Sequence, residues 1–366
     1  MERRLKALII AEIPAPYRVD VFIEMAKSMD VDVFFQANKD QSRSPDYFVK
    51  SARFPFSILD NKQGKKFFVK ALKEIRDYDL LIAYHPVCKA ALKAEWICKK
   101  NNIPYFVNID GAFIKPSIIK DSIKRWVYRG AAGCFSGSKA ATQYFLYYGV
   151  RKEKIIEYGF SGLHKKDVAQ AICSEEEKKK TRDYLGLEDK MTIIAVGQFI
   201  LRKGFDLLLD AWNRIDKENA QLIIIGGGPN RTAYESFISN NSLNNVILLD
   251  YVEKEKINLY YRASDIFVLP TREDVWGLVI NEAMAQGLPV LTTNMCNAGT
   301  QLIENGQNGY VVPVTVEAIA EKLYSMMERS DLPQMGEKNI KKISDYTIEN
   351  TADSHIRTIK AIMDKP

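Results

Sequence analysis

The stretch that decides the fold runs from Ile266 to Leu291 and reads IFVLPTREDVWGLVINEAMAQGLPVL. Its first four residues are apolar, which is typical of a strand buried on both faces of a parallel sheet. A polar turn follows, and a helical pattern begins at Leu278 and ends before Gly287. The last three residues start another strand. The stretch therefore predicts a strand–loop–helix–strand unit with its loop at the carboxyl end of a strand, where open α/β sheets bind ligands.

Two carboxylates in this unit, Asp274 in the loop and Glu282 in the helix, are separated by seven residues. We expect both to face one ligand across the helix N-terminus, because a carboxylate accepts hydrogen bonds from sugar hydroxyls. The N–H groups near Gly277 and Leu278 would attract a phosphate there. The acid pair alone also fits an ordinary crossover, with one acid at the helix dipole and the other solvated. The apolar neighbours of Glu282 argue against a plain solvated face.

The stretch resembles the Glu-x7-Glu motif of the retaining nucleotide-sugar glycosyltransferases of family 4 (group 1). The matching parts are Thr271-Arg272, Trp276-Gly277-Leu278 and the run from Glu282 to Val290. One departure is that Asp274 stands where the family has its first Glu. Its side chain is one methylene shorter, so its contact with the donor sugar would differ from the family's. The resemblance is strong over residues 191–313, whereas the N-terminal half matches by pattern only.

The resemblance implies the α/β GT-B fold, in which two Rossmann-like doubly wound domains face each other across a cleft. We expect an acceptor-binding domain over residues 1–166, rejoined by a C-terminal helix over 347–366, and a nucleotide-sugar-binding domain over 167–346. The length of 366 residues suits two domains. The charge is also divided, since residues 1–166 hold 30 Lys or Arg and 17 Asp or Glu, whereas the remainder holds 22 and 29.

A second segment of the C-terminal half predicts a diphosphate site. Arg202 and Lys203 supply positive charge, and Gly204 lets the backbone approach closely before a helix. A lysine before a helix is also an ordinary surface residue, but the flanking residues match the family's Gly-Arg…Lys-Gly segment. The family's arginine aligns with Gln198, so we expect Arg202 to replace its charge. Residues 297–300 are a plausible second phosphate loop.

The resemblance assigns roles to individual residues of this half. Catalytic roles fall to Asp274, Lys203 and Arg202, with Asp110 of the N-terminal half orienting the acceptor or taking its proton. Donor binding falls to Gly197, Gln198, Gly204, Gly226, Gly227, Gly228, Tyr251, Val252, Val275, Trp276, Gly277, Leu278 and Glu282. In this assignment Glu282 binds the ribose hydroxyls and Asp274 binds the sugar.

The N-terminal half alternates strand and helix patterns, with polar residues directly after its strands. We place Tyr17 and Arg18 in the loop after the first strand, before a helix over residues 19–27, and His85 after a later strand, all on the acceptor side. Each has a structural alternative. The Tyr17 segment is also a rigid proline-rich turn, Asp110 is also a turn residue before Gly111, and His85 before Pro86 is also a strand-end residue.

Two basic segments, residues 62–76 and 115–129, read as amphipathic helices. Such helices lie on anionic membranes, although their apolar faces would equally belong to the core with the charges as a solvated rim. No nucleic-acid-binding motif accompanies the basic charge. No apolar run approaches the length of a transmembrane helix, and the apolar start of the chain reads better as a buried strand than as a signal peptide.

The sequence therefore predicts a retaining, metal-independent glycosyltransferase that moves a sugar from a nucleotide diphosphate sugar, with a UDP-sugar favoured, to an acceptor hydroxyl. The resemblance points to bacterial cell-surface polysaccharide or lipopolysaccharide synthesis on a glycan or lipid-linked acceptor, in the cytoplasm at the inner face of the membrane. The five cysteines lack zinc spacing and predict reduced thiols, with no metal or cofactor. A sugar-nucleotide epimerase of the same fold and a catalytically silent nucleotide-sugar-binding protein remain alternatives.

Overall fold

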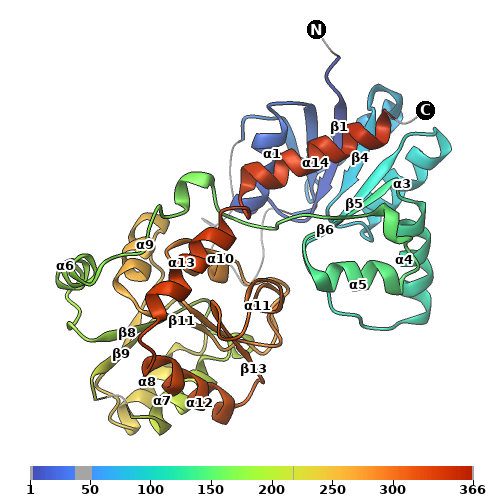
Figure 1. The fold of residues 1–366 in the computed structure, drawn as a ribbon. Helices are drawn as coiled ribbons and strands as arrows, with labels where there is room; N and C mark the ends of the chain where they lie inside the picture. Colours follow the sequence, from blue (N-terminus) through green and yellow to red (C-terminus); the bar gives the residue numbers. More distant parts are fainter. Residues whose placement is uncertain (1–2, 38–51, 217, 365–366) are drawn as a thin grey trace. The chain divides into compact units, whose positions relative to one another are not determined.

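Two parallel β-sheets organise the chain, and helices cover both faces of each sheet (Figure 1). The computed structural model describes residues 3–37, 52–216 and 218–364, without the side chains of Lys254 and Glu255. The chain divides into two compact units, Met1–His164 with Tyr346–Pro366 and Lys165–Asp345. These architectures confirm the predicted α/β class of two Rossmann-like doubly wound domains.

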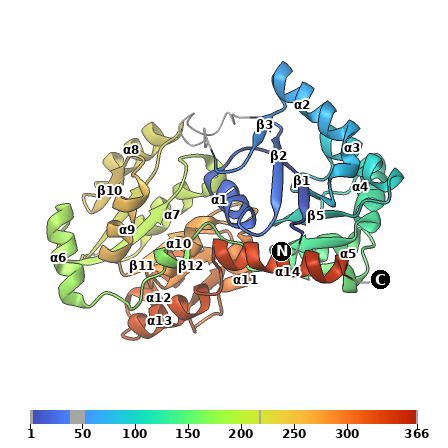
Figure 2. The same cartoon turned by 90° about the horizontal axis from the view of Figure 1, so that it is seen from above.

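The sheet of the N-terminal unit has seven strands in the order β3-β2-β1-β4-β5-β6-β7. The strands are β1 (Lys6–Ala11), β2 (Asp30–Phe35), β3 (Phe56–Ile58), β4 (Leu80–Ala83), β5 (Tyr105–Ile109), β6 (Gly133–Ser136) and β7 (Ile155–Glu157). The helices are α1 (Pro16–Met25), α2 (Lys62–Lys73), α3 (Lys89–Lys100), α4 (Ile118–Gly130), α5 (Lys139–Tyr147) and the C-terminal α14 (Ile348–Met363), which packs on α1. Figure 2 shows α14 beside α1 from a second direction.

The sheet of the C-terminal unit has six strands in the order β10-β9-β8-β11-β12-β13. The strands are β8 (Met191–Val196), β9 (Ala220–Ile225), β10 (Val246–Leu249), β11 (Ile266–Leu269), β12 (Val290–Thr293) and β13 (Gly309–Val312). The helices are α6 (Glu175–Leu185), α7 (Phe205–Arg214), α8 (Arg231–Asn240), α9 (Lys254–Ala263), α10 (Leu278–Ala285), α11 (Asn297–Leu302), α12 (Val316–Met327) and α13 (Leu332–Ile343).

Each unit has its own apolar core, because strands buried on both faces supply apolar side chains to the helices on either side. The central strands β4, β11 and β12 are buried along their whole length. All five cysteines are free thiols, and Cys98, Cys134 and Cys296 are buried. Among the helices of the described ranges, none is long and apolar enough to cross a bilayer.

The first helix begins earlier than expected. The sequence pattern placed it at residues 19–27, but α1 begins at Pro16 because proline at the first helical position has its φ preset and lacks an N–H that the helix would leave unpaired. Tyr17 and Arg18 therefore lie in the first turn of α1 and not in the loop after β1. Arg18 is buried as a result.

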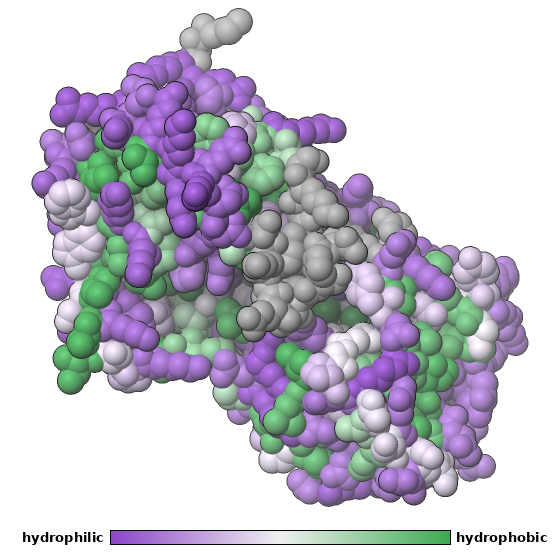
Figure 3. Space-filling model, turned by 180° about the vertical axis from the view of Figure 1, so that it is seen from behind, coloured by the Kyte–Doolittle hydropathy of each residue, from purple (hydrophilic) through white to green (hydrophobic). Residues whose placement is uncertain are grey.

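The two basic segments behave differently. In α2 the apolar residues Phe68 and Leu72 are buried in the core, so the solvated-rim alternative holds for this face. In α4 the side chains of Ile118 and Ile119 are 91% and 78% exposed, and only Val127 and Tyr128 are buried. Figure 3 shows a surface that is mostly hydrophilic on the face drawn, with smaller hydrophobic patches between.

Candidate functional site

Two loops meet where the strand order of the second sheet reverses. β8 lies between β9 and β11, so the chain continues from β8 to one side of the sheet and later adds strands on the other. The loop after β8 carries Arg202 and Lys203 in a short 3-10 turn, Leu201–Lys203, and the loop after β11 carries Asp274. The carboxyl edge at such a reversal is where open α/β sheets bind their ligands.

Lys203 and Asp274 form an ion pair at this point, between Lys203 Nζ and Asp274 Oδ2. The two side chains are only 13% and 11% exposed, so water screens the pair weakly. Arg202 Nη1 lies 3.9 Å from Asp274 Oδ1 and donates a hydrogen bond of 2.8 Å to the carbonyl oxygen of Glu273. One carboxylate thus lies between two cations that come from a different loop.

Gly204 is what allows the two loops to approach. Its φ is +74°, a left-handed conformation that residues with a side chain rarely adopt. A Cβ built there would lie 2.0 Å from the carbonyl oxygen of Pro270, which directly follows β11. Any other residue at position 204 would push the loop after β8 away from the loop after β11, and Lys203 would move with it.

Further contacts fasten the two loops. Arg272 donates two hydrogen bonds of 2.7 Å to the two carboxylate oxygens of Asp206 in α7, a bidentate pair with fixed geometry. A third bond of 2.8 Å runs from Arg272 Nη1 to the carbonyl oxygen of Leu201. Thr271 Oγ1 donates to the carbonyl oxygen of Arg202 at 2.9 Å. These contacts set the position of Arg202 and Lys203 relative to Asp274.

The segment after β12 is joined to the Asp274 loop by backbone hydrogen bonds. The N–H of Ala298 donates to the carbonyl oxygen of Trp276 at 2.9 Å, and that of Asn297 donates to the carbonyl oxygen of Asp274 at 3.3 Å. The expectation of a second phosphate loop at residues 297–300 stays a prediction. The N–H groups of Asn297 and Ala298 would have to leave these carbonyl groups to bind a phosphate.

Trp276 is a packing residue of the loop. Its side chain is buried and its Nε1 donates a hydrogen bond of 2.8 Å to Asn281 Oδ1 in α10. Val275 beside it is exposed, and Gly277 with a φ of +103° caps the N-terminus of α10, which begins at Leu278. Donor contacts of Val275, Gly277 and Leu278 stay predictions, and the ring of Trp276 would have to move to make one.

Glu282 lies half-buried in the second turn of α10. Tyr261, in α9, is fully buried and donates its hydroxyl to Glu282 Oε2 at 3.0 Å. Burial raises the pKa of Tyr261, so this hydroxyl stays protonated and donates its hydrogen bond at any physiological pH. The bond fixes the orientation of the carboxylate, an arrangement that suits recognition of a vicinal diol.

The predicted glycines shape the loops after β8 and β9. A Cβ on Gly226 would lie 1.8 Å from the carbonyl oxygen of Gly197. The backbones that follow β8 and β9 can therefore approach this closely only because residue 226 has no side chain. Gly228 lies against the backbone of Phe199, whereas Gly227 has open space around it. Gln198 is half-buried on the same edge.

The expected base-binding segment follows β10 on the same edge. Tyr251 is 80% exposed and Val252 is half-buried. Arg231 pairs with the preceding Asp250 at 2.6 Å. Contacts of Tyr251 and Val252 with a base stay predictions.

The N-terminal unit gathers its predicted residues at the carboxyl edge of its own sheet. Arg18, from α1, forms an ion pair with Asp110 Oδ2 directly after β5. Asp110 Oδ1 accepts hydrogen bonds of 2.9 Å from Asn108 Nδ2 and 2.8 Å from the Tyr158 hydroxyl. Three donors thus hold one carboxylate. The Arg18 guanidinium also lies 4.4 Å from the centre of the Tyr84 ring.

The C-terminal helix completes this network. His355 Nε2 lies 2.9 Å from Asn108 Oδ1, and its Nδ1 lies 2.8 Å from the carbonyl oxygen of Thr351. The ring stacks on Phe135 with centroids 4.0 Å apart. Burial lowers the pKa of His355 to about 4, although the hydrogen bond with Thr351 opposes this shift. Helix α14 therefore fixes Asn108, and through it Asp110.

Tyr17 and His85 lie at the same edge but outside the three-donor network. The Tyr17 ring packs edge-on against Phe160 with centroids 5.7 Å apart. His85 Nδ1 lies 2.8 Å from Gln36 Nε2 at the end of β2.

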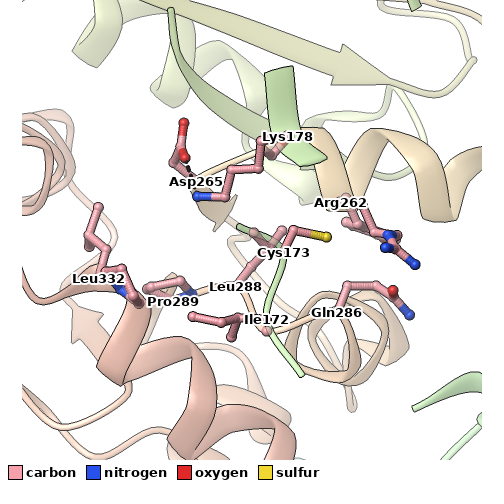
Figure 4. A pocket seen from close by; sticks show the side chains of 13 residues that line it. Ile172, Cys173, Lys178, Arg262, Asp265, Gln286, Leu288, Pro289 and Leu332 are labelled. Carbon is pink, nitrogen blue, oxygen red and sulfur yellow. Dashed lines mark hydrogen bonds and ion pairs between the residues drawn. The ribbon is translucent and has the colours of Figure 1, made fainter. Parts of the chain in front are cut away.

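A separate enclosed pocket lies at the opposite, amino edge of the second sheet (Figure 4). Asp265, which precedes β11, pairs there with Lys178 and Arg182 at 2.7 Å. These ion pairs join α6 to the sheet and contain none of the predicted site residues. In the described part of the chain, no group of three His, Cys, Asp or Glu residues is placed to hold a metal ion.

Sequence reasoning missed several residues that position the site. Asp206 and Tyr261 are distant in sequence from their partners, and no local spacing points to them. Asn108 and His355 did carry a signal, because each is a polar residue on an otherwise apolar strand or helix face. A polar side chain in such a place needs a hydrogen-bonding partner.

Comparisons with known proteins agree with this geometry. Residues 177–343 match the family model of the glycosyl transferases group 1. A glycosyltransferase of Haemophilus influenzae described as uncharacterized is 30% identical over 168 residues, which cover 44% of this chain and 47% of that protein. The chain spans about half or less of the length of the curated relatives that it matches.

Solved structures match over nearly the whole chain. Anabaena HepE in complex with UDP has a TM-score of 0.77 at 19% identity, covering 98% of this chain and all of that one. The lipopolysaccharide outer core galactosyltransferase WaaB has a TM-score of 0.71 at 15% identity, covering 98% and 99%. This likeness confirms the GT-B fold class. Together with the family match, it means that this GT-B protein carries a domain of the group 1 glycosyl transferases in residues 177–343.

Proposed function

We propose that the protein transfers a sugar from a nucleoside diphosphate sugar to an acceptor hydroxyl, retaining the configuration of the donor's anomeric carbon and using no metal ion. The observation that carries the proposal is the buried Lys203–Asp274 pair at the reversal point of the second sheet, with Arg202 beside it. It combines cations for a departing diphosphate with a carboxylate for a sugar. The match to group 1 glycosyl transferases covers this same segment.

Fixed cations do the work that a metal ion does in other transferases. As the bond between the sugar and the diphosphate breaks, negative charge grows on the leaving oxygen. Lys203 and Arg202 stabilise that charge because the loops hold them in place before the reaction begins. A bound diphosphate competes with Asp274 for Lys203, which releases the carboxylate to accept hydrogen bonds from the sugar hydroxyls.

The two acids then have separate roles. Glu282, oriented by Tyr261, binds the ribose hydroxyls of the nucleotide, and Asp274 binds the transferred sugar. Glu282→Gln should therefore weaken binding of free UDP, whereas Asp274→Asn should slow transfer while UDP still binds. Isothermal titration with UDP and initial rates with the full donor separate the two effects. Equal loss of UDP affinity in both variants would contradict this division.

Acceptor orientation falls to the N-terminal unit. Asp110 already accepts hydrogen bonds from three donors, so we assign it to positioning and leave proton removal to the leaving diphosphate oxygen. Tyr17, Arg18 and His85 lie at the same edge and frame the acceptor.

The test of the proposed function has two steps. The first screens nucleoside diphosphate sugars, with UDP-sugars foremost, for thermal stabilisation, where a ligand at 100 times its Kd adds about 2.7 kcal/mol. The second records the anomeric configuration of the product by NMR. Inverted product would overturn retention. Donor conversion without an acceptor would indicate an epimerase, and binding without any turnover would indicate a silent binding protein.

We also propose that the acceptor is lipid-linked and that the protein works at the inner face of the cell membrane, in the synthesis of a surface polysaccharide or lipopolysaccharide. Support comes from α4, where Ile118 and Ile119 project into solvent next to Lys120 and Arg125. Exposed apolar side chains beside cations suit an anionic lipid surface. The structural likeness to WaaB, a lipopolysaccharide galactosyltransferase, agrees with this pathway.

A further inference from the structure

A cavity of about 470 Å³ lies in the N-terminal unit, outside the Arg18–Asp110 network. Its walls come from four elements that end or begin at the carboxyl edge of the first sheet. The lining residues are Gln36 after β2, Leu59 after β3, Lys65, Phe68 and Val69 on α2, and Lys89 and Ala90 at the start of α3. Figure 2 shows these elements on one side of the unit. This volume is that of a small-molecule site.

The cavity combines two kinds of surface. Leu59, Phe68 and Val69 contribute apolar side chains to the lining, and Phe68 makes an edge-to-face contact with Phe34, whose ring centroid lies 5.2 Å away. The rim of the cavity carries Lys65 and Lys89, which are both exposed. No carboxylate in the described ranges pairs with either lysine, and none is among the residues that line the cavity. The two cations are therefore available to a negatively charged ligand.

The cavity also borders the acceptor side of the unit. Gln36 lines it and lies within hydrogen-bonding distance of His85, 2.8 Å from Nε2 to Nδ1. Lys89 is the first residue of α3, where the N–H groups of the first turn add positive potential. A ligand held in the cavity by its charged end would thus extend along the edge that carries His85.

We propose that this cavity binds the anionic, apolar-tailed part of the acceptor, with a phosphate or diphosphate on Lys65 and Lys89 and an apolar chain on Phe68, Leu59 and Val69. This inference rests on the proposed function and names the chemical class of its acceptor. Charge alone would not need an apolar lining, and an apolar ligand alone would not need two lysines. An amphiphilic phosphate uses both.

The test measures binding of three probes to the full chain saturated with UDP, so that the donor site is occupied. The probes are farnesyl diphosphate below its micelle concentration, inorganic pyrophosphate and farnesol. We expect farnesyl diphosphate to bind at least about 10-fold more tightly than either part alone, because the apolar chain and the charge contribute separately. Equal binding of pyrophosphate and farnesyl diphosphate would overturn the apolar part of the proposal.

Four variants locate the site. Lys65→Glu and Lys89→Glu should each weaken farnesyl diphosphate binding by about 10-fold or more, the loss expected for a charged hydrogen bond. Lys66→Glu and Lys93→Glu make the same charge change on the same two helices but outside the lining, and should change binding less than about 3-fold. If the control variants lose as much, binding is unspecific attraction and the inference is wrong. Lys89→Gln replaces Lys89→Glu should the latter not fold.

UDP binding, measured on the same samples, separates this inference from the proposed function. Intact UDP binding without any binding of farnesyl diphosphate overturns the acceptor class and leaves the transferase proposal standing. If wild-type protein binds neither UDP nor any nucleoside diphosphate sugar of the screen, that result would instead count against the transferase proposal itself.

Discussion

At the scale of single residues, the proposed chemistry depends most on Lys203. Its ammonium group contacts Asp274 and lies where a departing diphosphate would gain charge. Lys203→Ala should lower kcat about 10²–10³-fold, the loss typical of removing one stabiliser of transition-state charge. Lys190→Ala, which removes a lysine paired with Glu188 elsewhere in the same unit, is the matched control. Near-normal turnover of the Lys203 variant would refute the diphosphate assignment.

A second residue, Glu95, makes a prediction about stability. It is fully buried in α3, and neither carboxylate oxygen has a hydrogen-bond partner among the described residues. Burial raises the pKa of its carboxyl group from 4.5 to about 9. The folded state binds the proton of Glu95 more tightly than the unfolded state does. The contribution of this proton to the free energy of unfolding is therefore complete below pH 4.5 and is lost as the pH rises towards 9.

Thermal unfolding at several pH values measures this effect. Between about pH 6 and pH 9 the wild-type midpoint should fall relative to that of Glu95→Gln, which keeps the shape and cannot ionise. Glu153→Gln removes an exposed carboxylate of the same unit and should follow the wild type. Parallel curves for wild type and Glu95→Gln would show that Glu95 does not carry the pH dependence.

At the scale of elements, α4 is where the structure corrects the sequence. Lys124 belongs to the basic segment 115–129 for which a membrane contact was considered, but its side chain is 14% exposed and its Nζ donates a hydrogen bond of 3.0 Å to the Tyr148 hydroxyl. The basic and large apolar residues of the helix that are exposed are Ile118, Ile119, Lys120, Ile123, Arg125, Trp126 and Arg129. A membrane contact would therefore use these residues and not Lys124.

A liposome experiment tests this surface. Wild-type protein should sediment with anionic vesicles at low salt and dissociate as salt is added, because each basic residue near an anionic surface contributes about 1 kcal/mol within a Debye length. Lys120→Glu with Arg125→Glu, and separately Ile118→Ser with Ile119→Ser, should each release the protein without affecting UDP binding. Arg151→Glu with Lys152→Glu reverses the same charge elsewhere in the unit and should not. Wild-type protein that ignores the vesicles would redirect the proposal to a soluble acceptor.

The elements also show what could be predicted from the sequence. Strand β11 has its expected bounds and helix α10 begins at Leu278 as expected, because period and turn signals are local properties of the chain. The Arg18–Asp110 pair joins residues 92 positions apart, and the Arg272–Asp206 pair joins residues 66 apart. Such contacts follow from the order of strands in the sheet, which no local pattern contains. The site residues were therefore named from a motif, whereas their partners required the fold.

At the scale of the whole molecule, the two units have separate apolar cores and separate proposed ligands. A ligand that binds one folded unit stabilises that unit against opening, by RT ln(1 + [L]/Kd). UDP should therefore slow amide hydrogen exchange within residues 165–345, above all in β8, β11 and α10, whose loops and N-terminus form the proposed donor site. Strands β4 and β5 of the other unit should change little.

Farnesyl diphosphate, added to UDP-saturated protein, should produce the complementary pattern. Protection should appear in α2 and the start of α3, which line the proposed acceptor cavity, and should be absent from β8 and β11. Lys89→Glu should abolish this second pattern and leave the first intact, whereas Glu282→Gln should weaken the first pattern and leave the second intact. Protection of β4 and β5 by UDP alone, as strong as that of β8 and β11, would mean that the donor is not bound by the C-terminal unit by itself. The division of labour between the two units would then be wrong even if the chemistry at Lys203 were right.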